Sequence, residues 1–173
     1  IKADQNVDVT AGNDGALSGN VDAKGDADIK ADNTVTTTGE HINAEGQVNI
    51  SGTNGVSVDS TIAGGKDITA DSSEGSVELK KDVVGGANVT VTAKTDATVS
   101  GNVNSEANIN IAAGNNANVS GDVTAKENVG VSAGNAASVS GNVDAKGNVN
   151  VDAKHDATIS GNIKADENVD VTA

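Results

Sequence analysis

The chain has 173 residues and contains no Phe, Trp, Tyr, Met, Cys or Pro. A globular core of this size would be poorly filled without aromatic side chains, and the absence of Cys excludes disulfides and thiol chemistry. The formal net charge is −14, from 25 acidic residues against 11 lysines, which argues against nucleic acids and anionic membrane surfaces as partners.

The sequence repeats itself about every twenty residues from its first residue to its last. The clearest copies, at 101–120, 121–140 and 141–160, read GNVNSEANINIAAGNNANVS, GDVTAKENVGVSAGNAASVS and GNVDAKGNVNVDAKHDATIS. A repeat of this length predicts stacked structural units that share one continuous core.

Four columns of apolar residues keep their register along the chain. The first consists of Ile1, Val21, Ile42, Ile62, Val83, Val103, Val123, Val143 and Ile163. The second consists of Val7, Ala27, Val48, Ile68, Val89, Ile109, Val129, Val149 and Val169. The third consists of Val9, Ile29, Ile50, Ala70, Val91, Ile111, Val131, Val151 and Val171. The fourth consists of Leu17, Thr37, Val58, Leu79, Val99, Val119, Val139 and Ile159.

Two repeats contain one additional residue each. The insertions fall near Thr38–Glu40 and near Asp71–Gly75, which are polar, flexible stretches. Because the later columns are not displaced, we expect both insertions to lie at corners and to bulge outward.

Within each repeat, apolar and polar residues alternate with period two, which predicts strands and no helix. In the repeat that starts at Gly141 the expected strands are Val143–Ala145, Val149–Ala153 and Ala157–Ser160. Gly and Asn lie between them, and we expect these residues to supply a left-handed backbone at the corners. The predicted fold is therefore a right-handed parallel β-helix with about three short strands per coil of about 20 residues and about eight or nine coils.

One polar position recurs in all nine coils. It holds Asn6, Asp26, Gln47, Asp67, Asn88, Asn108, Asn128, Asn148 and Asn168. Identical amides in register can hydrogen-bond along the stack, so we interpret this column as a structural corner ladder. A ligand or metal track is the alternative, but the spacing follows the coil repeat and no coordination sphere. The same interpretation applies to the column of Asp82, Asn102, Asp122, Asn142 and Asn162.

No constellation of residues suggests catalysis, a cofactor or a metal site. The two histidines, His41 and His155, lie in different coils, and no H-E-x-x-H motif or phosphate-binding loop occurs. Calcium binding by the acidic corners is the one metal alternative, although the calcium-solenoid signature G-G-x-G-x-D-x-U-x is absent. We expect a protein that is not an enzyme and needs no cofactor.

Both ends of the chain lie inside the repeat. Residues 1–11 read IKADQNVDVTA and residues 163–173 read IKADENVDVTA. Repeat proteins need distinct polar caps, and neither end has one. We therefore expect residues 1–173 to be a single, uncapped solenoid segment, either an internal slice of a longer array or a subunit that stacks end to end.

The string GNVNVDAKHDATISGNIKADENVDVTA, with its G-N-[VI]-x-A…N-[VI]-x-V-x-A pattern, resembles the haemagglutinin-type repeats of filamentous haemagglutinin-like exoproteins. These are large adhesins that Gram-negative bacteria export by two-partner secretion. The resemblance covers the whole chain. It implies a right-handed parallel β-helix that serves as a stiff shaft, at the bacterial cell surface or secreted, in adhesion, biofilm formation or contact-dependent delivery.

The same resemblance implies that host or neighbouring cells are contacted through parts outside this chain. The alternative is a self-polymerising β-helical filament subunit similar to bactofilin-type cytoskeletal proteins, which also repeat Gly-Asn-Val and Ala motifs along a solenoid. The two alternatives differ in whether the rod is one long chain or a polymer.

Overall fold

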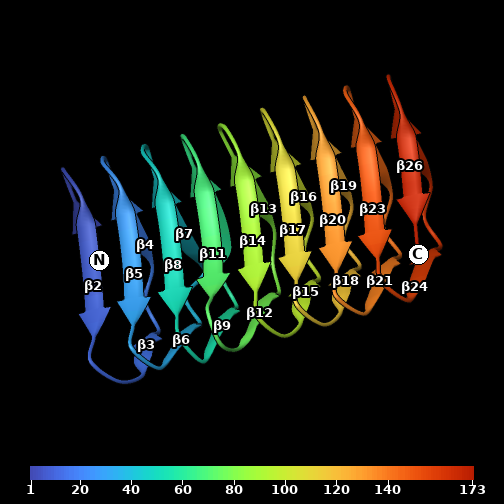
Figure 1. Cartoon of the computed structure of the whole chain (residues 1–173). Coiled ribbons are helices and arrows are strands. Elements are labelled where there is room, and N and C mark those ends of the chain that lie inside the picture. Colours follow the sequence, from blue (N-terminus) through green and yellow to red (C-terminus); the bar gives the residue numbers. More distant parts are fainter.

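The computed structural model describes residues 1–173 as a β-solenoid of about nine coils without a helix (Figure 1). Each coil contributes one strand to each of three parallel sheets, which run along the whole rod. In Figure 1 the strands of one sheet run downward in front and those of another run upward behind, while the chain advances from left to right. The coil is therefore right-handed, as the sequence predicts.

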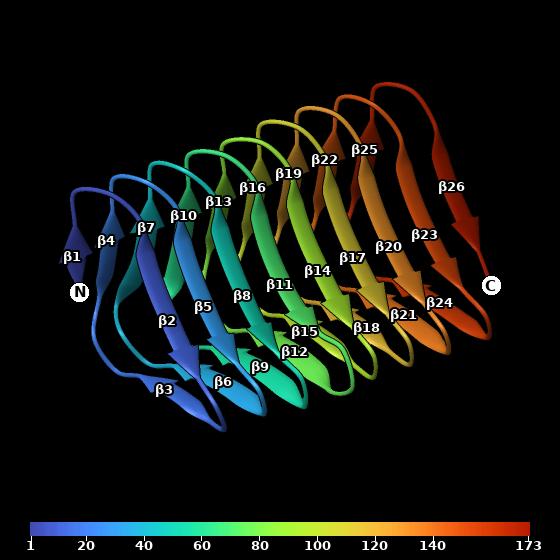
Figure 2. The same ribbon diagram turned by 60° about the vertical axis from the view of Figure 1, so that its left-hand side comes forward.

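The three sheets are named A, B and C in the order in which the chain enters them (Figure 2). Sheet A contains β1 (Lys2–Ala3), β4 (Val21–Ala23), β7 (His41–Ala44), β10 (Thr61–Gly64), β13 (Val83–Gly85), β16 (Val103–Ser105), β19 (Val123–Ala125), β22 (Val143–Ala145) and β25 (Ile163–Ala165). Sheet B contains β2 (Val7–Ala11), β5 (Ala27–Ala31), β8 (Val48–Gly52), β11 (Ile68–Ser72), β14 (Val89–Ala93), β17 (Ile109–Ala113), β20 (Val129–Ala133), β23 (Val149–Ala153) and β26 (Val169–Thr172). Sheet C contains β3 (Gly15–Leu17), β6 (Thr34–Thr37), β9 (Gly55–Val58), β12 (Ser76–Leu79), β15 (Ala97–Val99), β18 (Ala117–Val119), β21 (Ala136–Val139) and β24 (Asp156–Ile159).

The pairing register confirms the four predicted apolar columns. In sheet A, Val103 pairs with Val123, which pairs with Val143. In sheet B, Val129 pairs with Val149. The strands predicted for the repeat at 141–160 are also found, except that the third lies one residue earlier, as β24.

The core is a single stack of aliphatic side chains enclosed by the three sheets. Its buried apolar residues are all Val, Ile, Leu or Ala, and the alternating burial of strands such as β14 and β17 follows the pleat. β-Branched side chains suit such a pleated surface, and the narrow interior needs nothing larger than Leu. The absence of aromatic residues is thus a consequence of the fold.

Both insertions lie at corners, as predicted. The first falls between Thr37, which pairs with Val58, and Ile42, which pairs with Val21. The second falls between Asp71 and Ser76. The inserted segments expose Glu40 and Glu74 to solvent, and the strands on either side keep their register.

The prediction that corner Gly and Asn adopt a left-handed backbone is wrong. No residue of the chain, Gly included, has a positive φ. Most corner glycines are needed because successive coils approach closely. A Cβ at Gly121, Gly141 or Gly161 would overlap the carbonyl oxygen of the glycine one coil earlier. Gly101 is in the same situation against Lys81.

Candidate functional site

The polar ladder predicted from Asn6 to Asn168 runs along the corner between sheets A and B. At a typical step, the backbone N–H of Asn148 donates to Oδ1 of Asn128 at 2.8 Å, and Nδ2 of Asn148 donates to the same oxygen at 3.2 Å. Asn128 makes the equivalent pair of bonds to Asn108, at 3.1 and 2.9 Å. The backbone N–H of Val129, next to the ladder, donates to the carbonyl oxygen of Asn148 at 2.9 Å. Each coil therefore holds the next one through both backbone and side chain.

The ladder tolerates Asp wherever the next coil offers a donor. The backbone N–H of Gln47 donates to Oδ1 of Asp26 at 2.8 Å, and Asn88 donates to Oδ1 of Asp67 through its backbone N–H and its Nδ2, both at 3.0 Å. The step from Gln47 to Asp67 has no side-chain bond, since Gln47 replaces the shorter Asn. The structure thus brings all nine predicted residues into one column, with one step not joined by side chains.

A second ladder follows the corner between sheets C and A. The backbone N–H of Asn102 donates to Oδ1 of Asp82 at 2.8 Å, and Asp122 donates in the same way to Asn102 at 2.9 Å. Asn142 continues the series onto Asp122, and Asn162 onto Asn142. The predicted second column is therefore a ladder of the same kind.

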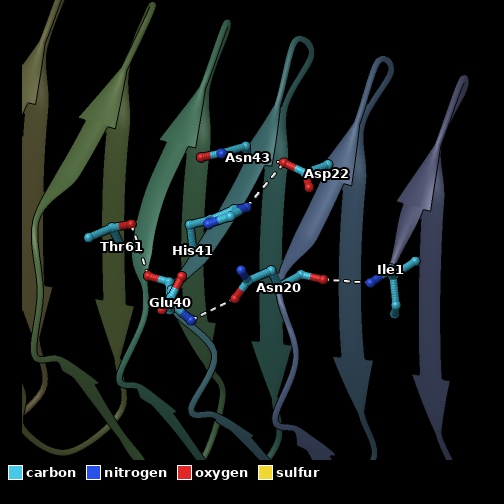
Figure 3. A network of polar contacts seen from close by, with 7 residues as sticks. All are labelled: Ile1, Asn20, Asp22, Glu40, His41, Asn43 and Thr61. Carbon is cyan, nitrogen blue, oxygen red and sulfur yellow. Dashed lines mark hydrogen bonds and ion pairs between the residues drawn. The ribbon is translucent and has the colours of Figure 1, made fainter.

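Related hydrogen bonds occur at the same corner near the amino-terminal end, as Figure 3 shows. The backbone N–H of Glu40 donates to Oδ1 of Asn20 at 2.8 Å, and the hydroxyl of Thr61 donates to the carbonyl oxygen of Glu40 at 3.1 Å. Because this coil contains the inserted residue, the donor is Glu40 and not His41, which is the residue in register with Asn20. Beside them, Nε2 of His41 lies 3.1 Å from Oδ1 of Asp22.

A third ladder, at the corner between sheets B and C, was not predicted. Near the amino-terminal end, Nδ2 of Asn33 donates to Oδ1 of Asp14 at 2.7 Å, and Nδ2 of Asn54 donates to Oδ1 of Asn33 at 2.7 Å. Further along, Asn115 and Asn116 both donate to Oδ1 of Asp96. These partners are 19, 20 or 21 residues apart, so no fixed spacing marks them in the sequence.

Hydrogen bonds lower the pKa of the Asp14 carboxyl. The hydroxyl of Thr34 donates to its Oδ1 at 2.6 Å, and this bond is the largest cause of a pKa below the ordinary value of 3.8. Desolvation opposes the shift, whereas the backbone N–H of Thr34 and the amide of Asn33 add to it. Hydrogen bonds that favour the charged form keep this carboxylate ionised.

Buried hydroxyls satisfy polar groups inside the solenoid. Oγ1 of Thr37 lies 3.1 Å from Oγ of Ser60, and Oγ of Ser72 donates to the carbonyl oxygen of Thr53 and accepts from the N–H of Gly75. No buried side-chain polar atom lacks a partner. The hydroxyls are therefore accounted for by structural bonds.

The remaining reactive residue types are scattered. His155 is exposed at a corner, far along the chain from His41, and no group of three His, Asp or Glu side chains is placed to hold a metal ion. No helix in the structure is able to cross a membrane.

Two shallow hollows lie on the outer faces of the sheets. One, of about 500 Å³, lies on sheet A above a floor that includes Ala23, Ala44 and Gly64. The other, of about 490 Å³, lies on sheet C among hydroxyl side chains such as Thr36 and Ser57. Both are open depressions between rows of side chains of successive coils.

Comparison with protein-family models, with curated proteins and with solved structures finds no significant match. Functional inference therefore depends on the geometry of the rod and its faces.

Proposed function

We propose that the chain is a segment of a non-catalytic shaft in a large secreted or cell-surface bacterial exoprotein, whose role is adhesion, biofilm formation or contact-dependent delivery. One observation carries this proposal: four apolar columns and two polar ladders continue through the coils with only two single-residue insertions. Such regularity suits a part of a protein that spans a long distance, because every coil makes the same contacts with the next one.

The corners support the same role. They consist of a few residues held by ladder bonds, and no long loop projects over a sheet to form a catalytic cleft. The repeat pattern similar to haemagglutinin-type shafts points in the same direction. In this proposal the contacts with host or neighbouring cells are made by parts outside these residues, and the rod needs no cofactor.

The test is the denatured mass of the native polypeptide that contains this segment. An antibody raised against residues 1–173 would be used on denatured cell extract and on the secreted fraction. A polypeptide of hundreds of kilodaltons, in the secreted or surface fraction, is the expected result for a shaft that is one long chain. A mass near 16.9 kDa in the cell extract would overturn the proposal and favour the self-polymerising filament.

A further inference from the structure

The outer face of sheet A carries two columns of outward side chains, one from within each strand and one from the residue after it. The first column consists of Lys2, Asp22, Asn43, Ala63, Val84, Asn104, Thr124, Asp144 and Lys164. The second column consists of Asp4, Lys24, Glu45, Gly65, Gly86, Glu106, Lys126, Lys146 and Asp166. We call these two columns the A face.

The A face is nearly neutral on a strongly acidic molecule. Of the 25 acidic residues and 11 lysines of the chain, the A face holds six and five. Nearly the whole net charge of −14 therefore lies elsewhere. Two copies would therefore repel each other less through this face than through sheet B or the acidic corners.

Charges at the amino-terminal end of the A face alternate in both directions. Across the first coil the pair is Lys2 and Asp4, and across the second it is Asp22 and Lys24. Along the rod, Nζ of Lys24 lies 2.9 Å from Oδ1 of Asp4. The four side chains thus form a checkerboard of opposite charges.

The carboxy-terminal end of the A face repeats this arrangement. Across the eighth coil the pair is Asp144 and Lys146, and across the ninth it is Lys164 and Asp166. Nζ of Lys164 lies 3.2 Å from Oδ2 of Asp144. These ion pairs are more than half exposed, so their charges are available to a partner surface and add little to the stability of the single chain.

A two-fold axis parallel to the rod brings the first column of one copy opposite the second column of the other, coil for coil. Lys2 then faces the partner's Asp4, and Asp22 faces the partner's Lys24. The two contacts are equivalent by symmetry, as in any isologous interface. The same operation pairs opposite charges in the eighth and ninth coils and places no two like charges opposite each other.

Other arrangements oppose like charges. In an antiparallel pair the first coil meets the ninth, so Lys2 faces Lys164 and Asp4 faces Asp166. A parallel pair displaced by one coil places Lys2 opposite Lys24. Since like-charge contacts are costly, the charge pattern specifies both the direction and the register of pairing.

The fourth and fifth coils of the A face are small and apolar. Val84 is 49 % exposed, and the depression of about 500 Å³ on the amino-terminal half is lined there by Ala63, Gly65 and Val84. In the parallel arrangement Val84 faces the partner's Gly86, where no side chain competes for the space. The centre of the face can therefore bury apolar surface between the two charged ends.

We propose that the A face is the interface between two copies of this chain, side by side, parallel and with identical coils opposite each other. The rod is nearly straight, so the columns stay in line over all nine coils (Figure 1). The inference stands on the charge pattern of sheet A and does not depend on the proposed shaft role.

The test measures association of the full chain by sedimentation velocity over a concentration series. A face two side chains wide belongs to the class of weak interfaces that bury less than about 1,200 Å², so the series extends to about 1 mM. The expected result is association at about 0.15 M ionic strength, where a screening length of about 8 Å damps the repulsion between the other surfaces, and weaker association at about 1 M, where this length falls to about 3 Å. A chain that stays monomeric throughout the series at about 0.15 M would overturn the proposal.

Charge-exchange variants make the test specific. An acidic variant combines Lys24→Glu with Lys146→Glu, and a basic variant combines Asp22→Lys with Asp144→Lys. Each should self-associate at least about tenfold more weakly than the original chain, because like charges then face each other. An equimolar mixture of the two should regain association. If the mixture stays monomeric, the pairing of these two columns is refuted.

The matched control combines Lys30→Glu with Lys94→Glu, which changes the net charge equally on surfaces outside the A face. This variant should associate like the original chain, and an equal loss would mean that net charge alone governs association. Register is read from zero-length cross-links between light and ¹⁵N-labelled copies. Mixed-isotope links Lys24–Asp22 and Lys146–Asp144 are expected, and links that join the two ends of the rod instead would overturn the parallel arrangement.

Discussion

At the scale of single residues, the recurring unit is a side-chain oxygen that accepts the backbone N–H of the next coil. Asn suits this task because its oxygen accepts while its Nδ2 donates to the preceding coil, as Asn148 does toward Asn128. An ionised Asp side chain accepts hydrogen bonds but has no N–H to donate to the preceding coil. In the ladders, a residue of the next coil donates to it, as the backbone N–H of Gln47 does to Asp26. The ladders thus give backbone N–H groups an acceptor and favour Asn or Asp at the same position of successive coils.

Removing one ladder amide should weaken the stack locally. Asn128→Ala deletes the acceptor of the Asn148 N–H and the donor to Asn108, so we expect a loss of about 1–3 kcal/mol in stability. Urea unfolding followed by circular dichroism measures it. Asn118→Ala, on the exposed outer face of β18, is the control and should change stability by less than about 0.5 kcal/mol. Equal effects of the two changes would contradict the ladder's role.

Asp14 offers a pH-dependent test. Thr34→Val removes the hydroxyl that is the largest cause of the lowered pKa, so the pKa of Asp14 should rise toward 3.8. A carboxyl with a lowered pKa stabilises the fold above pH 3.8, and this contribution is lost as the pH falls through the lower folded-state pKa. Carboxyl ¹³C titration by NMR measures the shift. Thr36→Val, one pleat further on and facing outward, should leave the titration of Asp14 unchanged.

At the scale of the element, a strand contributes to stability through the columns in which its side chains lie. A corner contributes through its close approach to the preceding coil. The strands are only two to five residues long, too short to be stable singly. Their stability comes from pairing on both sides and from the aliphatic stack within. Corners must therefore keep the spacing of the sheets, which is why side chains are excluded from positions such as Gly141.

The glycine positions predict opposite responses to the same substitution. Gly141→Ala places a Cβ against the carbonyl oxygen of Gly121 and should destabilise the rod by about 1–3 kcal/mol. Gly130→Ala, within β20, meets only the side chain of Asn110 at 3.3 Å and should be neutral or stabilising by up to about 1 kcal/mol. Thermal unfolding compares them. Since neither glycine has a positive φ, a similar loss for both would contradict the close-approach explanation.

A charge in the core should open the rod locally. Val149 is 1 % exposed in β23, so Val149→Asp should cost about 4 kcal/mol or more. Hydrogen exchange should show lost protection in β20, β23 and β26, while β2, β5 and β8 stay protected, because coils interact with their neighbours only. Asn150→Asp, the outward neighbour on the same strand, should leave exchange unchanged. Unaltered protection in Val149→Asp would show that the register is wrong.

At the scale of the whole molecule, the rod repeats the same coil along its axis, whereas its outer faces carry different side chains. Any coil can follow any other, because the same contacts recur, yet the outer faces differ in how their charges are arranged. Sheet A is balanced and patterned, whereas most of the net negative charge lies outside it. Coils can therefore be added along the axis without changing the contacts between neighbours, and the proposed pairing through the A face would fix one direction and one register.

Modularity predicts the effect of deletions. Removing residues 121–140 joins Ser120 to Gly141 and preserves every column, so the variant should keep its β-sheet circular dichroism and become shorter by about 4.8 Å. Removing residues 121–130 places Val131 where Gly121 stood and shifts every later column. That variant should lose ordered structure beyond the junction. Small-angle scattering and circular dichroism together decide, and folding of both variants would contradict the modular register.

The sequence by itself determined the solenoid, the register of the four columns, the two insertions and two of the three ladders. These features recur at nearly constant spacing, and the pleat requires that residues two apart share a face. The third ladder was not predicted because the separation of its partners varies. Asp96 accepts from Asn115, 19 residues later, and from Asn116, 20 residues later. Only the tertiary structure decided the role of the glycines and the second column of the A face. Both depend on which atoms of neighbouring coils meet and on which side chains a corner turns outward, and a one-dimensional spacing does not contain that information.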